Sequence, residues 1–292
     1  MTQPSPLSRP PFLAQPGPAL QPRLLCLPAR SQALDLILPP GASLLQAVAA
    51  PLLRAGFSSA VLELRGGRCD PFAYVLPAHA PDARHAAWYS APHAPAGGAR
   101  LERACVTFGT RDGAAWLHCH AIWEEGEGRR AGHVLPEETI LQAPVTARAW
   151  GLSGAGFAVG EDAETNFSLF QPVAISGPLP GPAGGRRALV LRLRPNTDMV
   201  AALEEACAAH GFAGAVLRGG VGSLVAPRFR EGGGTEDIAT ELLVTGGGVM
   251  GGRGAVAVAL ADMRGRVHAG RVAPGANAVC ITAELVLEEL PG

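Results

Sequence analysis

Apolar and polar residues alternate near the start of each half of the chain. Leucine occupies every second position over 34–38 and again over 189–193. A period of two residues is typical of a half-buried strand. A proline-containing turn follows each run, and then Ser43 or Asp198, whose side-chain oxygens can accept free backbone N–H groups at a helix N-terminus. The pattern therefore predicts a strand followed by a capped helix in both halves.

Each helix is predicted to be amphipathic and to end near Gly56 or Gly211, where a left-handed C-cap residue is expected. Pro51 predicts a kink or an early end in the first helix, because proline lacks the N–H donor and clashes with the preceding turn. Strand patterns fill the remainder of each half. The expected strands cover 60–64, 101–108, 115–123, 130–134 and 145–150, and then 215–217, 241–245, 255–261, 266–272 and 279–287. One helix with about six strands indicates an α+β domain with a largely antiparallel sheet.

The two halves repeat one another in sequence. The first strand, the turn and the Gly-Phe pair recur 155 residues later without a gap, and the segment 131–136 recurs 138 residues later. The shorter offset implies a net insertion in the first copy, which we place between Asp70 and Gly98. We therefore expect two domains of the same kind, at 24–150 and 186–290.

Two proline-rich segments flank the first copy. Residues 1–23 contain six prolines before Gln21 and predict a disordered tail. Residues 151–185 end in a run of Gly and Pro and predict a linker. Within the linker, the apolar segment 166–170 fits either a docked extra strand or free coil, and the sequence leaves both interpretations open.

Composition narrows the function classes. The 292 residues carry a formal net charge of −1, all 24 basic residues are Arg, and 48% of the chain is hydrophobic. A chain this apolar can form a core, and a near-neutral chain lacks the positive field that drives non-specific DNA binding. Neither a signal peptide nor an uninterrupted membrane-spanning run is found, and the six cysteines form no C-x-x-C pair. We expect a cytoplasmic protein with reduced thiols.

Histidines form the strongest chemical signal. His118 and His120 lie two residues apart on a predicted strand, so their side chains point to the same face. If the turn between Gly126 and Gly128 is centred after Gly126, residues whose numbers sum to 253 are antiparallel partners, and His120 faces His133. Three neutral imidazoles with an open fourth position suit zinc, and nickel, copper or iron also accept imidazole.

An H-x-H pair on a strand is more often an ordinary surface feature, and the second copy helps to weigh the two interpretations. At the offset of 138, His118, His120 and His133 correspond to Val256, Val258 and Arg271. Loss of all three imidazoles together is what a shared role predicts, although drift of surface positions would also allow it.

Several short motifs occur in the same order in both copies. They are the strand, Pro-turn and capped helix; Gly-Phe with a Val-Leu strand; Gly219–Ser223; Glu241–Leu243; Leu117–His120; Ala131–Leu135; and Thr282–Val286. In these motifs the chain resembles the PPC (plants and prokaryotes conserved) domain family, over about 230 residues. The resemblance implies two tandem PPC-like domains, a homo-oligomer that is a trimer, and a metal site at His118, His120 and His133. The AT-hook motif that lets plant relatives bind DNA is missing.

Three functions are compatible with this resemblance. The first is an oligomeric PPC-domain protein with a three-histidine metal site in the first copy and a degenerate second copy. The second is a metal-dependent hydrolase or lyase that acts on a small metabolite, for which Glu102, Glu124 and Glu125 are candidate bases and Trp116, Trp123 or Arg103 could line a pocket. The third is a DNA-binding regulator, against which the charge balance argues.

Overall fold

The computed structural model describes residues 12–126, 128–175 and 185–291. We call residues 12–175 the N-terminal half and residues 185–291 the C-terminal half. The N-terminal half contains α1 (Leu44–Arg54) and the strands β1 (Leu24–Leu38), β2 (Ala60–Arg65), β3 (Arg68–Cys69), β4 (Tyr74–Val75), β5 (Pro77–Ala78), β6 (Trp88–Tyr89), β7 (Ala99–Arg111), β8 (Ala114–Glu125), β9 (Gly128–Val134), β10 (Val145–Asp162) and β11 (Phe167–Ile175). The C-terminal half contains α2 (Met199–His210) and the strands β12 (Arg186–Leu193), β13 (Gly214–Leu224), β14 (Glu241–Met250), β15 (Arg253–Ala261), β16 (Val267–Arg271) and β17 (Val279–Glu289).

Both halves have the same order of strands within a 15-stranded sheet. Outward from β1 the N-terminal half runs β10-β2-β7-β8-β9, and outward from β12 the C-terminal half runs β17-β13-β14-β15-β16. Among the described strands, the single Ala158–Thr110 bridge between β10 and β7 is the one parallel pairing. This confirms the predicted α+β class, with one helix and a largely antiparallel sheet of about six strands in each half.

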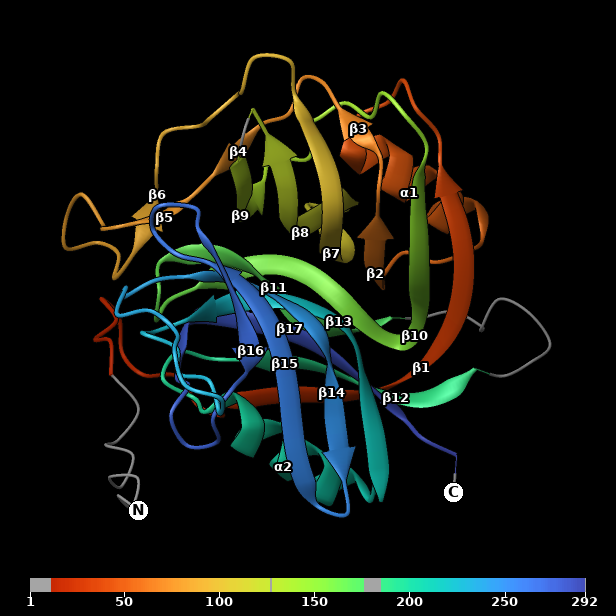
Figure 1. Cartoon of the computed structure of the whole chain (residues 1–292). Helices are drawn as coiled ribbons and strands as arrows, with labels where there is room; N and C mark the ends of the chain where they lie inside the picture. The colour runs from red at the N-terminus through yellow and green to blue at the C-terminus, as the bar shows by residue number, and fades with distance from the viewer. Residues whose placement is uncertain (1–11, 127, 176–184, 292) are drawn as a thin grey trace.

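Strand β1 joins the two halves. Its residues 24–31 pair with β12, and its residues 30–38 pair with β10. In Figure 1, α1 with β2, β7, β8 and β9 lies above and the C-terminal half lies below, with the first part of β1 crossing the lower part and α1 and α2 well separated. Each helix covers the outer face of its sheet. The two halves therefore face one another through the sheet surfaces that carry no helix.

Each helix covers a hydrophobic core of its own half. Leu52 of α1 and Leu203 of α2 are both fully buried, each in a separate cluster of apolar side chains. Ser43 forms a capping box with Gln46, and Asp198 accepts two backbone N–H groups at the start of α2. Within the described residues, no helix is long and apolar enough to cross a membrane.

Pro51 lies inside α1 and the helix continues to Arg54, so the helix does not end early there, and the kink that the sequence offered as the alternative stays a prediction. Proline removes one backbone hydrogen bond to the preceding turn. Burial of Val48 and Leu52 on either side offsets this loss, because both side chains are fully buried in the N-terminal core. The predicted C-terminal glycines are left-handed, with φ of 84° at Gly56 and 68° at Gly211.

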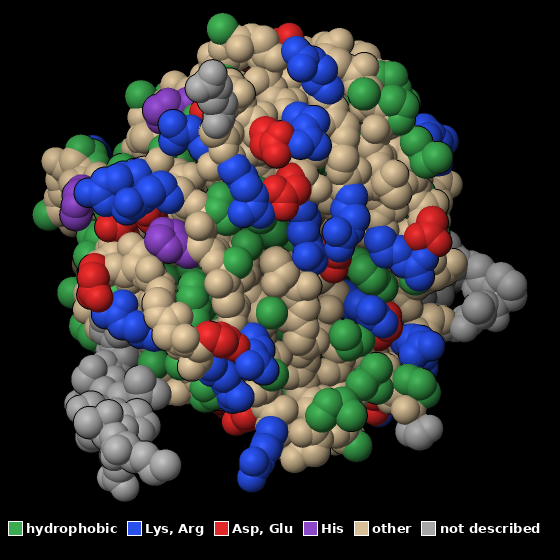
Figure 2. Space-filling model, in the orientation of Figure 1, with side chains coloured by type: hydrophobic (Ala, Val, Ile, Leu, Met, Phe, Trp, Pro, Cys, Tyr) green, Lys and Arg blue, Asp and Glu red, His purple; other side chains and the backbone are tan. Residues whose placement is uncertain are grey.

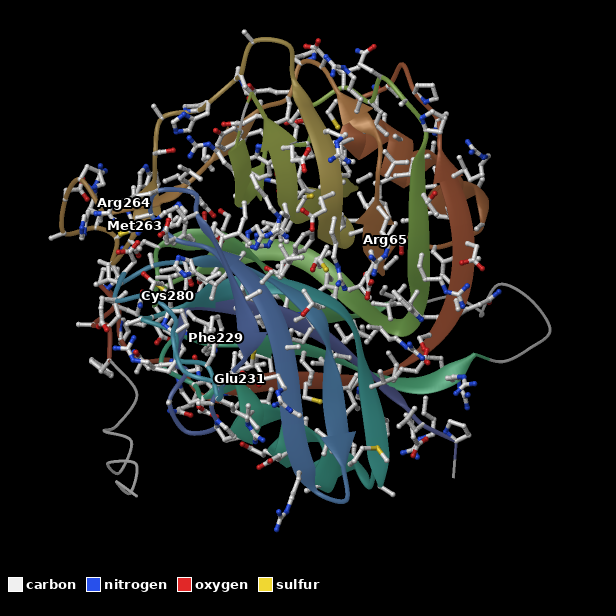
Figure 3. The ribbon with its side chains drawn as sticks, viewed as in Figure 1. Arg65, Phe229, Glu231, Met263, Arg264 and Cys280 are labelled. Atoms are coloured by element: carbon white, nitrogen blue, oxygen red, sulfur yellow. The ribbon has the colours of Figure 1, made fainter. Side chains whose placement is uncertain are left out.

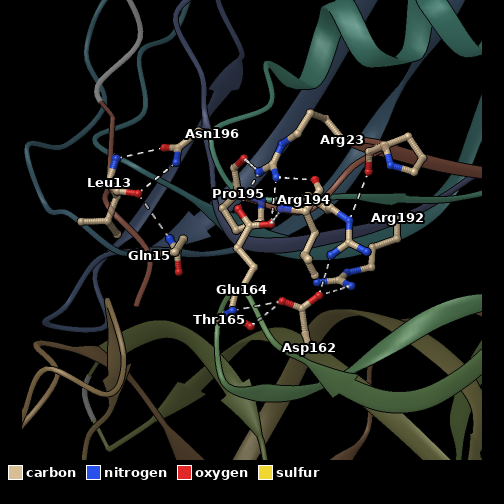
Figure 4. Close-up of polar contacts among 12 residues, drawn as sticks. Leu13, Gln15, Arg23, Asp162, Glu164, Thr165, Arg192, Arg194, Pro195 and Asn196 are labelled. Atoms are coloured by element: carbon tan, nitrogen blue, oxygen red, sulfur yellow. Dashed lines mark hydrogen bonds and ion pairs between the residues drawn. The ribbon is translucent and has the colours of Figure 1, made fainter. Parts of the chain in front are cut away.

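The segment before β1 is bound to the body of the protein, at least over residues 12–23. Leu13 exchanges two hydrogen bonds with Asn196, and Arg23 pairs with the buried carboxylate of Glu164 at 2.8 Å (Figure 4). Disorder predicted for 1–23 is therefore corrected for this part, because polar groups of both halves, Glu164 and Asn196, hold it. Residues 1–11 lie outside the described residues.

The linker predicted for 151–185 contains regular structure. Strand β10 extends to Asp162, and β11 pairs with β10 over nine residues, so the docked-strand interpretation of 166–170 holds. The Gly- and Pro-rich residues 176–184 lie outside the described residues.

A buried ion cluster lies where β10 meets β12. The Asp162 carboxylate accepts hydrogen bonds from Arg192 and Arg194, both at 2.7 Å, and the Asp162 and Arg192 side chains are at most 1% exposed. Thr165 donates to the same carboxylate through its backbone and its hydroxyl group (Figure 4). The cluster ties the end of the N-terminal half to the first strand of the C-terminal half.

Buried apolar side chains form the contact between the facing sheets. Cys105, Ile122 and Ala131 of the N-terminal half pack with residues of β13, β14 and β15 in one buried cluster. The close approach brings β8 of the first half next to β14 of the second, and this is where the candidate site lies.

Candidate metal centre

The hairpin of β8 and β9 has the register that the sequence predicts. His120 is paired with His133, and Glu125 is paired with Gly128, so partner numbers sum to 253. His118 lies on the same face, two residues before His120. The ring centroids of His118, His120 and His133 are 4.5, 5.0 and 5.3 Å apart. The three imidazoles therefore meet at one point.

One nitrogen from each ring faces this point. One ring nitrogen of each histidine lies within 4.8 Å of those of the other two, and Nε2 of His118 is 2.9 Å from Nε2 of His120. Two nitrogens bound to one zinc ion at about 2.0–2.1 Å lie about 2.9 Å apart at a right angle and about 3.3 Å apart at the tetrahedral angle. Nδ1 of His133 is buried and has no hydrogen-bond partner among the described residues. The donor set thus has the size of a metal-binding site.

The other nitrogens of His118 and His120 are held by the C-terminal half. Nδ1 of His118 lies 3.1 and 3.0 Å from the two carboxylate oxygens of Glu284, and Nδ1 of His120 lies 2.7 Å from the carbonyl oxygen of Leu242. A carboxylate and a carbonyl can only accept, so both Nδ1 atoms carry the proton. Both Nε2 atoms then face each other with lone pairs, an arrangement that requires a proton or a metal ion between them.

A second carboxylate reaches the same point. Oε2 of Glu241, at the start of β14, lies 2.9 Å from Nε2 of His120. The Glu241 side chain is 9% exposed and the Glu284 side chain is 1% exposed. Two buried carboxylates beside three imidazoles give the site a local negative charge, which favours a bound cation.

The pKa values of two histidines differ in direction. Burial lowers the pKa of His118, but the charge and hydrogen bond of Glu284, together with the charge of Glu241, outweigh it and raise the pKa above its ordinary value. Burial, followed by the charges of His118 and His120, holds the pKa of His133 well below its ordinary value. His133 is therefore neutral near pH 7, as a metal ligand must be.

The carboxylates that the sequence suggested as bases are engaged elsewhere. Glu102 forms an ion pair with Arg129 at 2.7 Å, and both side chains are more than 40% exposed. Glu124 pairs with Arg100, and Glu125 accepts hydrogen bonds from Tyr74 and Trp123. The residue that the sequence aligns with Glu102 in the second copy, Glu241, is the one that reaches the imidazoles.

Of the three residues suggested to line a pocket, only Trp116 lies beside the imidazoles. Trp116 borders a cavity that His118 and His133 also line. Trp123 is fully buried in the N-terminal core, and Arg103 pairs with Glu63 at 3.0 Å, so neither lines this cavity.

Glu284 and Glu241 are the site residues that sequence reasoning missed. Both stand in motifs that were recognised in the second copy, 282–286 and 241–243, but these motifs were interpreted only as strands. A signal was available, because a glutamate on a strand that otherwise reads as buried needs a partner.

The predicted repeat alignment of the histidines is off by one residue. Val256 and Val258 are at most 1% exposed and lie in the C-terminal core, on the face that Cys119 takes in the N-terminal core. The counterparts of the β8 histidines on the opposite face are therefore Ala257 and Ala259. The second half does lack both imidazoles, at these two positions.

The insertion at 70–98 forms a wall of the site. Val75 of β4 pairs with His133, and the Tyr89 ring lies 5.1 Å from the His133 ring. Tyr89 belongs to the two-stranded sheet of β5 and β6. Among its described residues, the second half has no equivalent of this sheet.

A known protein family matches the C-terminal part of the chain. The family model of the Plants and Prokaryotes Conserved (PCC) domain matches residues 181–291. This is the family named above on sequence motifs, and the match falls on the half that lacks the histidines. No curated protein matches the chain.

Solved structures resemble about half of the chain. A PPC protein of Pyrococcus horikoshii has a TM-score of 0.40 and 14% identity, covering 51% of this chain and 97% of its own. A metal-containing protein of Archaeoglobus fulgidus has a TM-score of 0.40 and 15% identity, covering 49% and 94%. A protein of Ralstonia eutropha JMP134, named for a proposed DNA-binding role, has a TM-score of 0.34 and 13% identity, covering 47% and 89%.

Proposed function

We propose that the protein binds one divalent metal ion, zinc in the first place, through His118, His120 and His133. The observation that carries this proposal is the pair of Nε2 atoms 2.9 Å apart, each with its Nδ1 proton already donated to the C-terminal half. His133 supplies the third donor through the ring nitrogen that lies within 4.8 Å of those of the other two histidines.

Zinc fits this donor set best for chemical reasons. Three neutral imidazoles with an open position are typical of catalytic or exchangeable zinc sites. Hydrogen bonds from ligand imidazoles to a carboxylate or a backbone carbonyl fix the tautomer and raise ligand basicity. Glu284 and the Leu242 carbonyl supply both kinds of partner. Nickel, copper and iron share the affinity for imidazole and are outcomes of the test below.

Elemental analysis of protein purified without chelator tests the proposal. We expect one metal ion per chain, with loss of the metal in His118→Ala and in His133→Ala. His79→Ala is the matched control, because His79 is an exposed histidine of the insertion. Isothermal titration of zinc into the apoproteins should show tight binding to wild type and His79→Ala and weaker binding to the other two variants. Absence of bound metal from wild type, together with no measurable zinc binding, overturns the proposal.

A metal-dependent enzyme is the second candidate function. The position of the Glu241 carboxylate favours it. Its carboxylate lies 2.9 Å from Nε2 of His120, where it could take a proton from a molecule bound at the imidazoles. The cavity beside His118 and His133 gives such a molecule access. A screen of hydrolase and lyase substrates should find turnover that Glu241→Gln abolishes while metal content stays the same. Turnover that persists in Glu241→Gln would exclude this role.

DNA binding is not favoured. Arginine and acidic side chains are interspersed over the face in Figure 2, and the net charge is −1. Many arginines also pair with carboxylates, as Arg100 does with Glu124. The homo-oligomer, a trimer by resemblance, stays a proposal that sedimentation analysis can test.

A further inference from the structure

Two cavities border the imidazole cluster, and they differ in size. One lies between β6, β11 and β17, with Cys280 in its wall (Figure 3), and has a volume of about 40 Å³. A cavity of this size holds only about three water molecules. The other, which we call the entry cavity, is lined by His118 and His133 among others and has a volume of about 260 Å³. Of these two, only the entry cavity is wide enough for a hydrated ion.

Two of the three imidazoles can be reached from the entry cavity. The His118 side chain is 13% exposed, whereas the His120 side chain is 1% exposed. Nδ1 of His133 is buried and has no hydrogen-bond partner among the described residues. An ion in the entry cavity therefore meets His118 and His133 first.

Two glutamates line the entry cavity where it opens to solvent. Glu137 and Glu138 are both exposed and lie in the turn after β9. Among the described residues, neither carboxylate has an ion-pair or hydrogen-bond partner. Other exposed carboxylates of the protein are paired, as Glu102 is with Arg129. The turn thus places two uncompensated negative charges at the opening.

The second half has a corresponding turn without the glutamates. In both halves the residue after the turn, Thr139 or Asn277, offers its backbone carbonyl to the first N–H of the helix. At the offset of 138, the two glutamates correspond to Gly275 and Ala276. The contact with the helix therefore does not require the carboxylates. They are present in the half that has the imidazoles and absent from the half that lacks them.

One free cation also lines the entry cavity. The Arg111 guanidinium lies over the Trp116 ring, 5.2 Å from its centroid, and pairs with no carboxylate among the described residues. Glu284 lines the cavity too, but its carboxylate is held by His118. Two free carboxylates thus face one free guanidinium, and a negative excess at an opening raises the local concentration of cations.

We propose that Glu137 and Glu138 capture a hydrated divalent metal ion at the opening and that the ion enters the imidazole cluster through the entry cavity. The inference rests on the metal site proposed above and adds the route to it. The two carboxylates act on the rate at which the ion arrives, and the imidazoles hold it once bound. Charged clefts of this kind speed the association of an oppositely charged ligand, and salt screens the effect.

Stopped-flow mixing of apoprotein with zinc, followed by an indicator dye, tests the route. At about 0.01 M salt, where the screening length is about 30 Å, the double variant Glu137→Gln, Glu138→Gln should take up zinc at least about threefold more slowly than wild type. Arg111→Gln should take up zinc faster than wild type, because it removes the opposing charge. At about 1 M salt, where the screening length is about 3 Å, the three rates should converge. Equal rates of wild type and the double variant at low salt overturn the proposal.

Release of zinc from the loaded proteins into excess chelator is the second measurement. The double variant should release zinc no faster than wild type, because neither glutamate is a ligand of the bound ion. Faster release together with unchanged uptake would show that the glutamates hold the bound ion, and it would overturn the entry role.

Glu205→Gln combined with Glu236→Gln is the matched control. It removes the same net charge at two exposed glutamates outside the entry cavity, so its uptake rate should stay closer to that of wild type. Uptake as slow as in the Glu137 and Glu138 variant would assign the effect to total charge and overturn the route. Zinc bound by wild type, with uptake that no variant changes, overturns the route alone. A protein that binds no metal overturns the site as well.

Discussion

The two halves of the chain share a strand order but use the same strands differently. In the N-terminal half, β8 places His118 and His120 toward the other half. In the C-terminal half, the equivalent face of β15 carries Ala257 and Ala259, and Ala259 packs in the buried contact between the halves. One strand supplies two imidazoles to the cluster, and its counterpart supplies a close-packed surface.

The second half nevertheless takes part in the site. Glu284 of β17 orients His118, and the Leu242 carbonyl of β14 orients His120. The Glu241 carboxylate lies 2.9 Å from Nε2 of His120. A half that lacks these imidazoles thus fixes the tautomers of two imidazoles in the other half. The comparison teaches that loss of the histidines in one copy does not make that copy dispensable, because the site is built across the interface.

The largest expected effect comes from the ion cluster that joins the halves. Asp162→Asn leaves two arginines without their shared carboxylate, and breaking a buried ion pair in this way costs roughly 3–5 kcal/mol. Chemical denaturation followed by circular dichroism would measure the change. Exposed Glu236, paired with Arg228, offers a control, since Glu236→Gln should cost less than about 1 kcal/mol. A loss of the same small size in Asp162→Asn would show that the cluster does not join the halves.

The lowered pKa of Asp162 predicts how folding stability changes as the pH falls. Burial opposes its ionisation, but hydrogen bonds and charge from Arg192, with those from Thr165, outweigh burial and lower its pKa. A lowered pKa in the folded state means that the contribution is full above the ordinary pKa of aspartate and is lost as the pH falls through the lowered value. The stability difference between wild type and Asp162→Asn should therefore shrink below about pH 4, the ordinary aspartate value. A difference that stays constant to pH 2 would refute the assignment.

The next effect compares the two cores directly. Leu52 and Leu203 are fully buried leucines of α1 and α2. Leu52→Ala and Leu203→Ala should each cost about 2–5 kcal/mol through lost burial and a residual cavity. Because β1 pairs with strands of both halves, we expect each variant to keep a single unfolding transition in calorimetry. Two resolved transitions would show that the halves unfold separately.

Replacing Glu284, whose carboxylate holds His118 from the second half, should have a smaller effect, on zinc affinity. Glu284→Gln keeps the shape but weakens the hydrogen bond that orients His118, so zinc affinity should fall about 10- to 100-fold. Competition with a chromogenic chelator measures the affinity, and Glu236→Gln again serves as control. Unchanged affinity would mean that the second half does not tune the site.

The helix caps give the smallest expected effect. Ser43→Ala removes the α1 capping box, and Asp198→Ala removes a cap of α2 that also accepts the Asn277 N–H. Loss of an N-cap costs about 0.5–2 kcal/mol. We expect the Asp198 variant to lose more stability in thermal melts, because its carboxylate holds a loop as well as a helix. The reverse order would contradict this interpretation of the loop contact.

Local patterns determined much of this protein. Alternating leucines and the cap residues at 43 and 198 predicted the strands and helices, because periodicity and capping act over a few residues. The two glycines around the turn predict the hairpin register that pairs His120 with His133, and the structure has this register. These inferences hold because each depends on neighbours in the chain.

Contacts between distant segments were decided only by the tertiary structure. Glu284 lies 166 residues from His118 in the chain, and no local pattern links them. The same applies to the N-terminal segment, which Asn196 and Glu164 hold in place, and to the insertion that walls the site with Tyr89. Pairing of buried charges depends on which surfaces the packed sheets bring together, and the packing of the whole chain sets those surfaces.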